Sequence, residues 1–353
     1  MRSVLLAGAA FAALTITAVL AQPAPAAGPY SVVKTSVVGG EGGFDYVFAD
    51  VAGRRLYIPR SGQTPPPRIA VFDLDTLQPV GEVAGFNAHG AVVDPKSGHG
   101  FATSKPVVMW DAKTLATIKT IDVQGGPDGI LFDPFNQRVY SLSHSAPNVT
   151  VINAVDGSIA GTIDLGGAPE QAVTDGAGHI YVDIEDKGQV AVIDARTMMV
   201  TARYDLGAPD LTPAGLAFDV KNHILFVACR NPASMVILNS DTGKILATLP
   251  IGTGVDGATF NPATMEAFSS QGDGTLTVIK ESSPTSFAVE QTVQTKIGAK
   301  TLTLDSKTNR ILLMTADFGP PPPPANPPPA GGRGRGARGP AIPGSFSIIA
   351  VGK

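Results

Sequence analysis

The chain repeats a motif of about 42 residues from about residue 42 to its C-terminus. Each copy contains a short apolar run that leads into a turn at an Asp or Asn. The seven turn positions are Asp50, Asp94, Asp133, Asp175, Asp219, Asn261 and Asp305. A regular period of this length is typical of solenoids and of toroidal repeat folds.

Five of the copies contain a second apolar run at the same position in the repeat, and this run also ends in Asp or Asn. These runs are Ile69–Asp73, Val107–Asp111, Val149–Asn153, Val190–Asp194 and Met235–Asn239. An Asp or Asn side chain there can accept a hydrogen bond from the backbone N–H two residues later. Thr or Gly follows in most copies, which predicts a hairpin corner.

Four short strands fit into each copy, separated by Gly, Pro and Asp/Asn turns, and helical periodicity is absent beyond the N-terminus. Each copy therefore predicts one small antiparallel sheet, which cannot bury both of its faces alone. Seven such sheets packed radially cover one another. The sequence thus predicts an all-β fold, a seven-bladed β-propeller of four-stranded antiparallel blades.

The two ends of the chain complement each other. The chain stops at Ser345–Lys353, a third strand that no fourth strand follows, while Ser31–Gly40 resembles the fourth strand within Ala116–Gly125. We therefore expect residues 31–38 to complete the last blade and close the ring. Their deletion would expose an unpaired strand edge.

The N-terminus predicts export. Arg2 precedes an apolar run from Val4 to Leu20, so residues 1–21 resemble a cleavable signal peptide, followed by a Pro/Ala spacer at 22–29. We expect one propeller domain at 30–353, periplasmic or secreted and monomeric. No later apolar run is long enough for a membrane span. The single cysteine, Cys229, allows no internal disulfide and is interpreted as a buried apolar residue.

A Pro/Gly/Arg-rich segment at 319–344 interrupts the last repeat and contains too few apolar side chains to pack, which predicts a disordered loop. By position it joins the second and third strands of blade seven. The shorter loop Ser61–Arg68 has the same place in blade one, so the two loops should lie side by side on one face. The loop arginines are Arg333, Arg335 and Arg338. Three arginines in a chain of net charge −4 do not favour nucleic-acid binding, so we interpret them as part of a solvated flap.

The fourth repeat carries a recognisable pattern in Ile163–Pro169, Ile180–Val182 and Gln189–Thr197. The chain resembles the YVTN-repeat (YncE-like) propellers, whose units read as an aromatic-Val strand, Val-x-Val-Ile-Asp-x-x-Thr, and Ile-x-Val-Gly-x-x-Pro-x-Gly. The resemblance covers residues 30–353. Trp110-Asp111 mimics the ending of a WD40-like repeat but occurs once, so we interpret it as a variant of the Ile-Asp ending.

Polar residues recur five positions before each turn, where the innermost strands start. They are Asp45, His89, Asp128, Glu170, Asp256 and Lys300, with Ala214 in the remaining copy. Because strand direction alternates, these positions and the loops between second and third strands share one face. We expect the six polar residues to surround the mouth of the central channel as a ligand-binding ring.

Two interpretations of this ring remain open. The side chains could simply bind channel water and cap strand ends, or they could bind a ligand. Asp128, Glu170 and Asp256 would attract a cationic ligand or a divalent cation. The ion would be Ca²⁺ or Mg²⁺ with oxygen ligands, or Zn²⁺ or Mn²⁺ if His89 takes part. Lys300 is interpreted as an ion-pair partner of Asp45 and Asp256 in preference to a catalytic amine.

The other charged groups are interpreted as surface features. They are the acids Asp183, Glu185 and Asp186, taken as a solvated hairpin, and the histidines His99, His144, His179 and His223.

Motifs of common catalytic centres are absent from the sequence: Gly-x-Ser-x-Gly, His-Glu-x-x-His, Cys-x-x-Cys and the phosphate loop. The resemblance implies a non-catalytic exported propeller that binds a protein, an envelope component or a small ligand. The alternative is a metal-dependent lactonase or esterase-like hydrolase of the gluconolactonase kind, by analogy of fold. A quinone-dependent dehydrogenase fits less well, since those propellers have tryptophan-rich units and this chain has one Trp.

Overall fold

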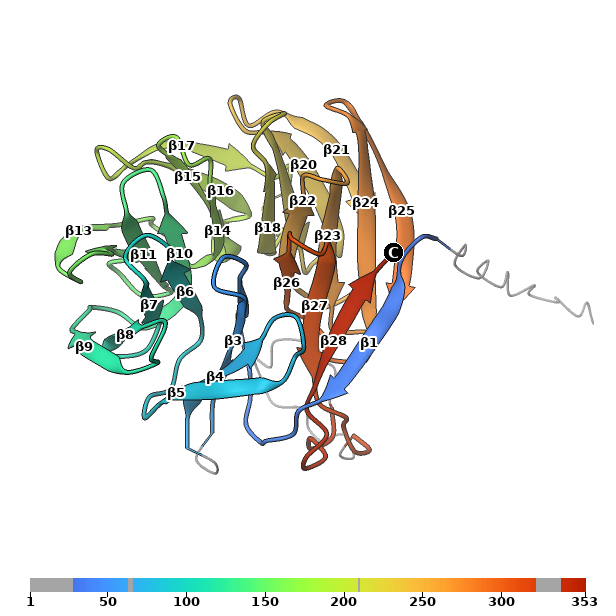
Figure 1. The fold of residues 1–353 in the computed structure, drawn as a ribbon. Helices are drawn as coiled ribbons and strands as arrows, with labels where there is room; N and C mark the ends of the chain where they lie inside the picture. The colour runs from blue at the N-terminus through green and yellow to red at the C-terminus, as the bar shows by residue number, and fades with distance from the viewer. Residues whose placement is uncertain (1–27, 63–65, 209, 322–337) are drawn as a thin grey trace, which may run out of the picture.

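Seven four-stranded antiparallel sheets surround a common axis in the computed structural model (Figure 1), which confirms the predicted fold class. The structure describes residues 28–62, 66–208, 210–321 and 338–353. The predicted signal peptide, most of the spacer, and Arg333 and Arg335 lie outside these ranges. Within them, no helix has the length and apolar character needed to cross a membrane.

In blades 1 to 6 the four strands follow one another from the axis outward in chain order. Blades 1 to 3 are β2 (Phe48–Asp50), β3 (Arg55–Arg60), β4 (Arg68–Asp73) and β5 (Pro79–Ala84); β6 (Ala91–Asp94), β7 (His99–Ala102), β8 (Val107–Asp111) and β9 (Thr117–Ile121); and β10 (Pro127–Asp133), β11 (Arg138–Ser143), β12 (Val149–Asn153) and β13 (Ile159–Ile163).

Blades 4 to 6 follow the same order. They are β14 (Pro169–Thr174), β15 (His179–Ile184), β16 (Gln189–Asp194) and β17 (Met199–Asp205); β18 (Pro213–Asp219), β19 (Ile224–Cys229), β20 (Ser234–Asn239) and β21 (Ile245–Pro250); and β22 (Val255–Asn261), β23 (Glu266–Gln271), β24 (Thr275–Ser283) and β25 (Ser286–Gln294). A single turn of 3₁₀ helix, Glu185–Lys187, follows β15.

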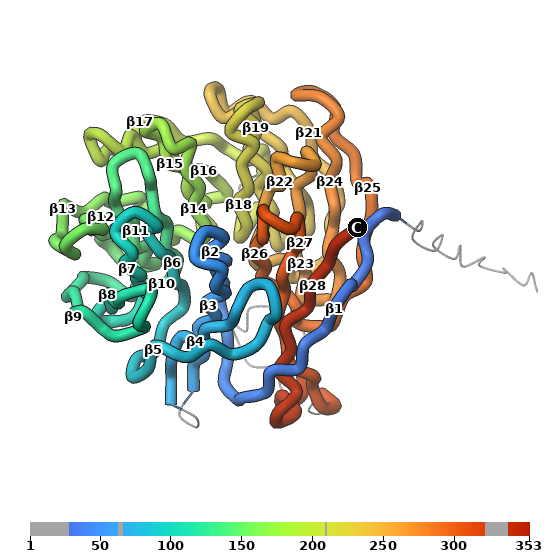
Figure 2. Tube along the Cα trace, viewed as in Figure 1, coloured from blue at the N-terminus to red at the C-terminus, as the bar shows by residue number. Residues whose placement is uncertain are grey.

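Blade 7 combines the two ends of the chain. Its inner strands are β26 (Leu302–Asp305), β27 (Arg310–Thr315) and β28 (Ser347–Gly352), and β1 (Ser31–Val37) forms its outer edge. β1 runs antiparallel to β28, from the Ser31 and Gly352 pair to the Val37 and Ser347 pair. Figure 2 shows this blue strand beside the red one. The predicted closure is confirmed.

Tyr30 fastens the start of β1 to blade 6. Its backbone N–H donates to Gln291 Oε1 at 2.9 Å, and Gln291 Nε2 donates back to the Tyr30 carbonyl at 2.7 Å. The buried Tyr30 ring meets Phe268 edge-on, with 5.3 Å between ring centroids, and its hydroxyl donates to Glu266. The closing strand is therefore held by side chains as well as by backbone pairing.

The predicted Asp/Asn turns form as expected. Asp94 Oδ1 accepts from the Lys96 N–H at 2.9 Å, two residues later, and Asp305 accepts from Lys307 in the same way. At the outer hairpin of blade 1, Asp73 Oδ1 accepts from the Thr76 N–H at 2.7 Å. These local hydrogen bonds explain why Asp or Asn recurs at fixed positions.

The hydrophobic core is divided into seven clusters, one between each pair of neighbouring blades. Phe226 of blade 5 stacks on Phe260 of blade 6 with 5.5 Å between centroids, and Trp110 of blade 2 packs on Tyr57 of blade 1. Cys229 is fully buried between blades 4 and 5, as predicted. Each blade therefore depends on both neighbours for burial of its apolar faces.

Candidate functional site

The structure brings the six predicted ring residues to one face, around the axis. Asp45, His89 and Lys300 precede the innermost strands of blades 1, 2 and 7, while Asp128, Glu170 and Asp256 are the second residues of β10, β14 and β22. Neighbouring innermost strands contact one another around the whole ring. Side chains at this one level of the blades therefore converge.

His89 joins the acids of blades 1 and 3. Its Nδ1 lies 2.9 Å from Asp45 Oδ2 and 3.2 Å from Asp128 Oδ1. The hydrogen bond with Asp45 raises the pKa of His89, which favours the imidazolium form. Burial, followed by the nearby charge of Asp45, raises the pKa of Asp128.

His144 continues the ring, although the sequence suggested only a surface histidine. It directly follows β11, and its Nε2 lies 3.3 Å from Asp128 Oδ2 and 3.7 Å from Glu170 Oε1. Its side chain is 37% exposed, so it is reachable from solvent while it contacts both acids. His144 is a surface residue, as predicted, but it also contacts two acids of the ring.

Arg230 is the largest omission from the sequence-based site. It directly follows β19, and its Nη1 lies 3.2 Å from Glu170 Oε1 and 2.5 Å from Glu185 Oε1. Its Nη2 also contacts Asp256 Oδ1. The guanidinium of Arg230, in blade 5, therefore compensates acids of both neighbouring blades, 4 and 6.

Lys300 pairs with the second carboxylate oxygen of Asp256. This contact confirms the predicted ion pair on the Asp256 side, while Asp45 pairs with His89. Both oxygens of Asp256 thus face a cation.

A simple signal could have identified the missing members. His144, Glu185 and Arg230 each stand one residue after the second strand of blades 3, 4 and 5. The register argument that found the ring at the start of the first strands therefore applies equally to the ends of the second strands. Both sets lie on the same face because adjacent strands are antiparallel.

The interpretation of Asp183, Glu185 and Asp186 as a solvated hairpin was wrong for the first two. Asp183 is completely buried, and neither of its carboxylate oxygens has a hydrogen-bond partner among the described residues. Burial raises the pKa of Asp183 well above its usual range, which favours the neutral acid in the folded protein. Glu185 binds Arg230, and Asp186 alone is largely exposed.

Strand alternation explains the burial of Asp183. Tyr181 lies two residues earlier on β15 and packs into the cluster between blades 4 and 5, so Asp183 points to the same side. The sequence pattern of three clustered acids suggested exposure, but the pleat of the strand decides it.

Tyr46 and Gln171 line the channel next to the ring residues Asp45 and Glu170. The Tyr46 hydroxyl donates to Glu170 Oε2 at 2.8 Å, and burial raises the pKa of Tyr46 well above its usual value. Gln171 Nε2 donates to the Ala258 carbonyl at 3.0 Å, while its Oε1 accepts from the backbone N–H groups of Leu216 and Ala258. Gln171 therefore bridges the innermost strands of blades 4, 5 and 6 across the channel, whose remaining space is about 270 Å³.

Two groups of side chains have the geometry to hold a metal ion. Asp45, His89 and Asp128 form one, and Asp128, His144 and Glu170 form the other, with ligand atoms within 4.8 Å of one another in each. Mixed imidazole and carboxylate ligands suit Zn²⁺ or Mn²⁺ better than Ca²⁺. Metal binding by Asp128, Glu170 and Asp256 together stays a prediction of the hydrolase alternative, because a binding scaffold does not require an ion.

The strand ends that flank the two predicted loops contact each other, while contact between the loops themselves stays a prediction. The guanidinium of Arg60, at the end of β3, lies 3.4 Å from the ring centroid of Phe346, just before β28. Arg338 is the one loop arginine within the described ranges. Its Nη2 donates to the Gly272 carbonyl of blade 6 at 3.2 Å.

Searches for related proteins do not assign the chain to a family. No protein-family model matches it, and no curated protein is significantly similar to it. The function is therefore argued from the geometry of the ring.

Proposed function

We propose that this protein is an exported, non-catalytic β-propeller of the YVTN-repeat (YncE-like) kind that binds its partner through the ring face. The partner is a small ligand, a protein or an envelope component, and the geometry favours a small polar ligand. The observation that carries the proposal is the charge compensation around the ring. The acids are Asp45, Asp128, Glu170, Glu185 and Asp256, and the basic residues are His89, His144, Arg230 and Lys300.

A compensated ring presents hydrogen-bond donors and acceptors side by side. His89 and His144 are partly exposed at its rim, with 46% and 37% of their side chains accessible. Glu170 and Asp256 are mostly buried, so their charges act at a lower effective dielectric than in water. Such a surface can bind a ligand that carries both acceptor and donor groups.

The resemblance to YVTN-repeat propellers and the signal-like N-terminus support export and a binding role. Both rest on residues of the sequence: Arg2 with the apolar run that follows it, and the strand pattern of Gln189–Thr197.

Ligand-observed NMR with a set of zwitterionic and polar fragments tests this proposal. We expect fragments to bind the wild type and to lose binding in a Glu170→Gln/Asp256→Asn variant. Asp241→Asn is the matched control, because Asp241 is exposed and lies in the β20–β21 hairpin on the opposite face. Equal fragment binding by all three folded proteins would contradict the proposal.

One observation favours a second candidate, a metal-dependent lactone or ester hydrolase. Asp128, His144 and Glu170 would hold the ion, and Tyr46 orients Glu170 through its hydroxyl. A bound divalent ion would polarise a substrate carbonyl. Calorimetric titration with Zn²⁺ or Mn²⁺ tests the site directly, and this candidate requires binding that His144→Ala abolishes.

A further inference from the structure

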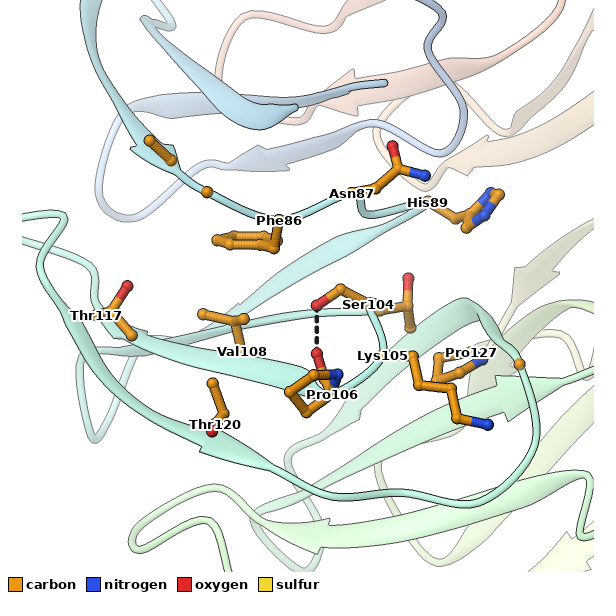
Figure 3. A pocket seen from close by; sticks show the side chains of 14 residues that line it. Phe86, Asn87, His89, Ser104, Lys105, Pro106, Val108, Thr117, Thr120 and Pro127 are labelled. Carbon is orange, nitrogen blue, oxygen red and sulfur yellow. Dashed lines mark hydrogen bonds between the residues drawn. The ribbon is translucent and has the colours of Figure 1, made fainter. Parts of the chain in front are cut away.

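A groove on the ring face runs outward from His89 over blade 2 and encloses about 580 Å³ (Figure 3). Residues 84–89, which join blades 1 and 2, form one wall. The β7–β8 loop, residues 103–106, forms the other, and β8 and β9 contribute its outer end. Its volume lies in the range of small-molecule sites, roughly 300–1,000 Å³.

The middle of the groove is apolar. The ring of Phe86 lies opposite the side chains of Val108 and Pro106 in Figure 3. Val108 is almost completely buried at the base of the groove. A flat or aliphatic body placed between Phe86 and Val108 would bury apolar surface on both sides.

Basic side chains line the inner end of the groove, where two acids of the ring lie behind His89. His89, Asn87 and Lys105 lie toward this end in Figure 3, and the fourteen lining residues include no Asp or Glu. Asp45 and Asp128 contact Nδ1 of His89, so Nε2 is the ring nitrogen left to face a ligand. The Lys105 ammonium donates to the Gly125 carbonyl, which holds it at the rim.

We propose that this groove binds a small amphipathic carboxylate, with its apolar body between Phe86 and Val108 and its carboxylate at Lys105, toward the inner end. The inference rests on the proposed binding function and names the ligand class. The Lys105 ammonium complements a single negative charge. The hydroxyls of Thr117 and Thr120 line the outer end and suit a polar tail.

Isothermal titration calorimetry with three probes that share a naphthalene ring system and differ in charge tests whether the groove prefers an anion. The probes are 2-naphthoate, 2-naphthalenemethanol and 2-naphthylmethylammonium. We expect 2-naphthoate to bind at least about tenfold more tightly than the neutral alcohol, and the ammonium probe not to bind. Lys105→Gln should weaken 2-naphthoate about tenfold and leave the alcohol unchanged, whereas Lys113→Gln, in an exposed hairpin of the same blade, should change neither.

A blocking variant tests the location. Thr120→Trp places an indole in the groove and should abolish 2-naphthoate binding. Thr162→Trp is the matched control, because Thr162 is exposed at the corresponding position of β13 in blade 3. Thr162 pairs with Thr150, the second residue of β12, just as Thr120 pairs with Val108, the second residue of β8.

Equal affinity for the three probes, or unchanged 2-naphthoate binding in folded Thr120→Trp, would overturn the inference. Preference for the ammonium probe would also overturn it, because the ring acids would then dominate the groove. If 2-naphthoate fails while the polar fragments still bind in a Glu170-dependent way, the groove inference alone is wrong. Failure of both sets of ligands would reject the proposed function too.

Discussion

Arg230 Nη1 lies 3.2 Å from Glu170 Oε1 and joins blade 5 to blade 4 at the mouth of the axis. The same guanidinium contacts Asp256 of blade 6. Three neighbouring blades are thus connected by one side chain, whose removal would take a cation away from three mostly buried acids.

Arg230→Met should therefore destabilise the fold strongly. Loss of one partner from a buried ion pair costs about 3–5 kcal/mol, because the remaining charge is desolvated and unpaired. Urea unfolding measures the change. Arg310→Met, at an exposed position of blade 7, is the control and should change stability by less than about 0.5 kcal/mol. Equal losses in the two variants would show that Arg230 does not compensate the ring.

Asp183→Asn should stabilise the protein at neutral pH. Burial raises the pKa of Asp183 in the folded state, whereas the unfolded chain ionises it near pH 4. The folded state therefore binds more protons above this pH, and the wild type loses stability as pH rises from about 4. Asn removes this loss, so the advantage of the variant should grow between pH 4 and 7. The check is unfolding free energy against pH, with the exposed Asp186→Asn as control; parallel curves for wild type and Asp183→Asn would contradict the assignment.

Glu281 provides a second pH test on a different blade. Burial is the largest cause that raises the pKa of Glu281 to about 7, and Asn222 Nδ2 donates to its Oε1 at 2.7 Å. The wild type should lose on the order of 2–3 kcal/mol of stability between about pH 4.5 and 7, since the unfolded carboxylate ionises first. Glu281→Gln should flatten this part of the stability curve. A carboxyl ¹³C titration of Glu281 with its midpoint near pH 4.5 would refute the prediction.

The closing strand should depend on Tyr30. Tyr30→Ala removes a buried ring from the face of Phe268 and should cost about 3–5 kcal/mol. Hydrogen exchange should then accelerate at the amides of β28 that pair with β1. Tyr30→Phe, which removes only the hydroxyl bond to Glu266, should have a smaller effect. Unchanged exchange in Tyr30→Ala would show that backbone pairing alone closes the ring.

The fold could be predicted because its determinants are local and repeated. Asp94 and Asp305 form turns with residues two positions later, so their spacing is visible in the sequence. The closing strand could be recognised because Ser31–Gly40 resembles another fourth strand.

The site was predicted only in part, for a physical reason. The register of the first strands identifies Asp45 and His89, but Arg230 meets Glu170 from 60 residues away and only in the folded ring. The burial of Asp183 was not predicted, because it depends on which side of β15 the side chain occupies and on the blade packed against that side. The number of acids nearby in the sequence does not determine it. The groove depends on the path of residues 84–89 between two blades, which no local pattern specifies.

The most direct test of the central claim is the thermal unfolding midpoint of the protein, measured after chelation and again with Ca²⁺, Mg²⁺, Mn²⁺ or Zn²⁺. A ring compensated by its own basic side chains binds ligand without a metal, so the account predicts the same midpoint in all five conditions. A gain of several degrees with one cation, lost in Asp128→Ala, would contradict the account and favour the metal-dependent hydrolase.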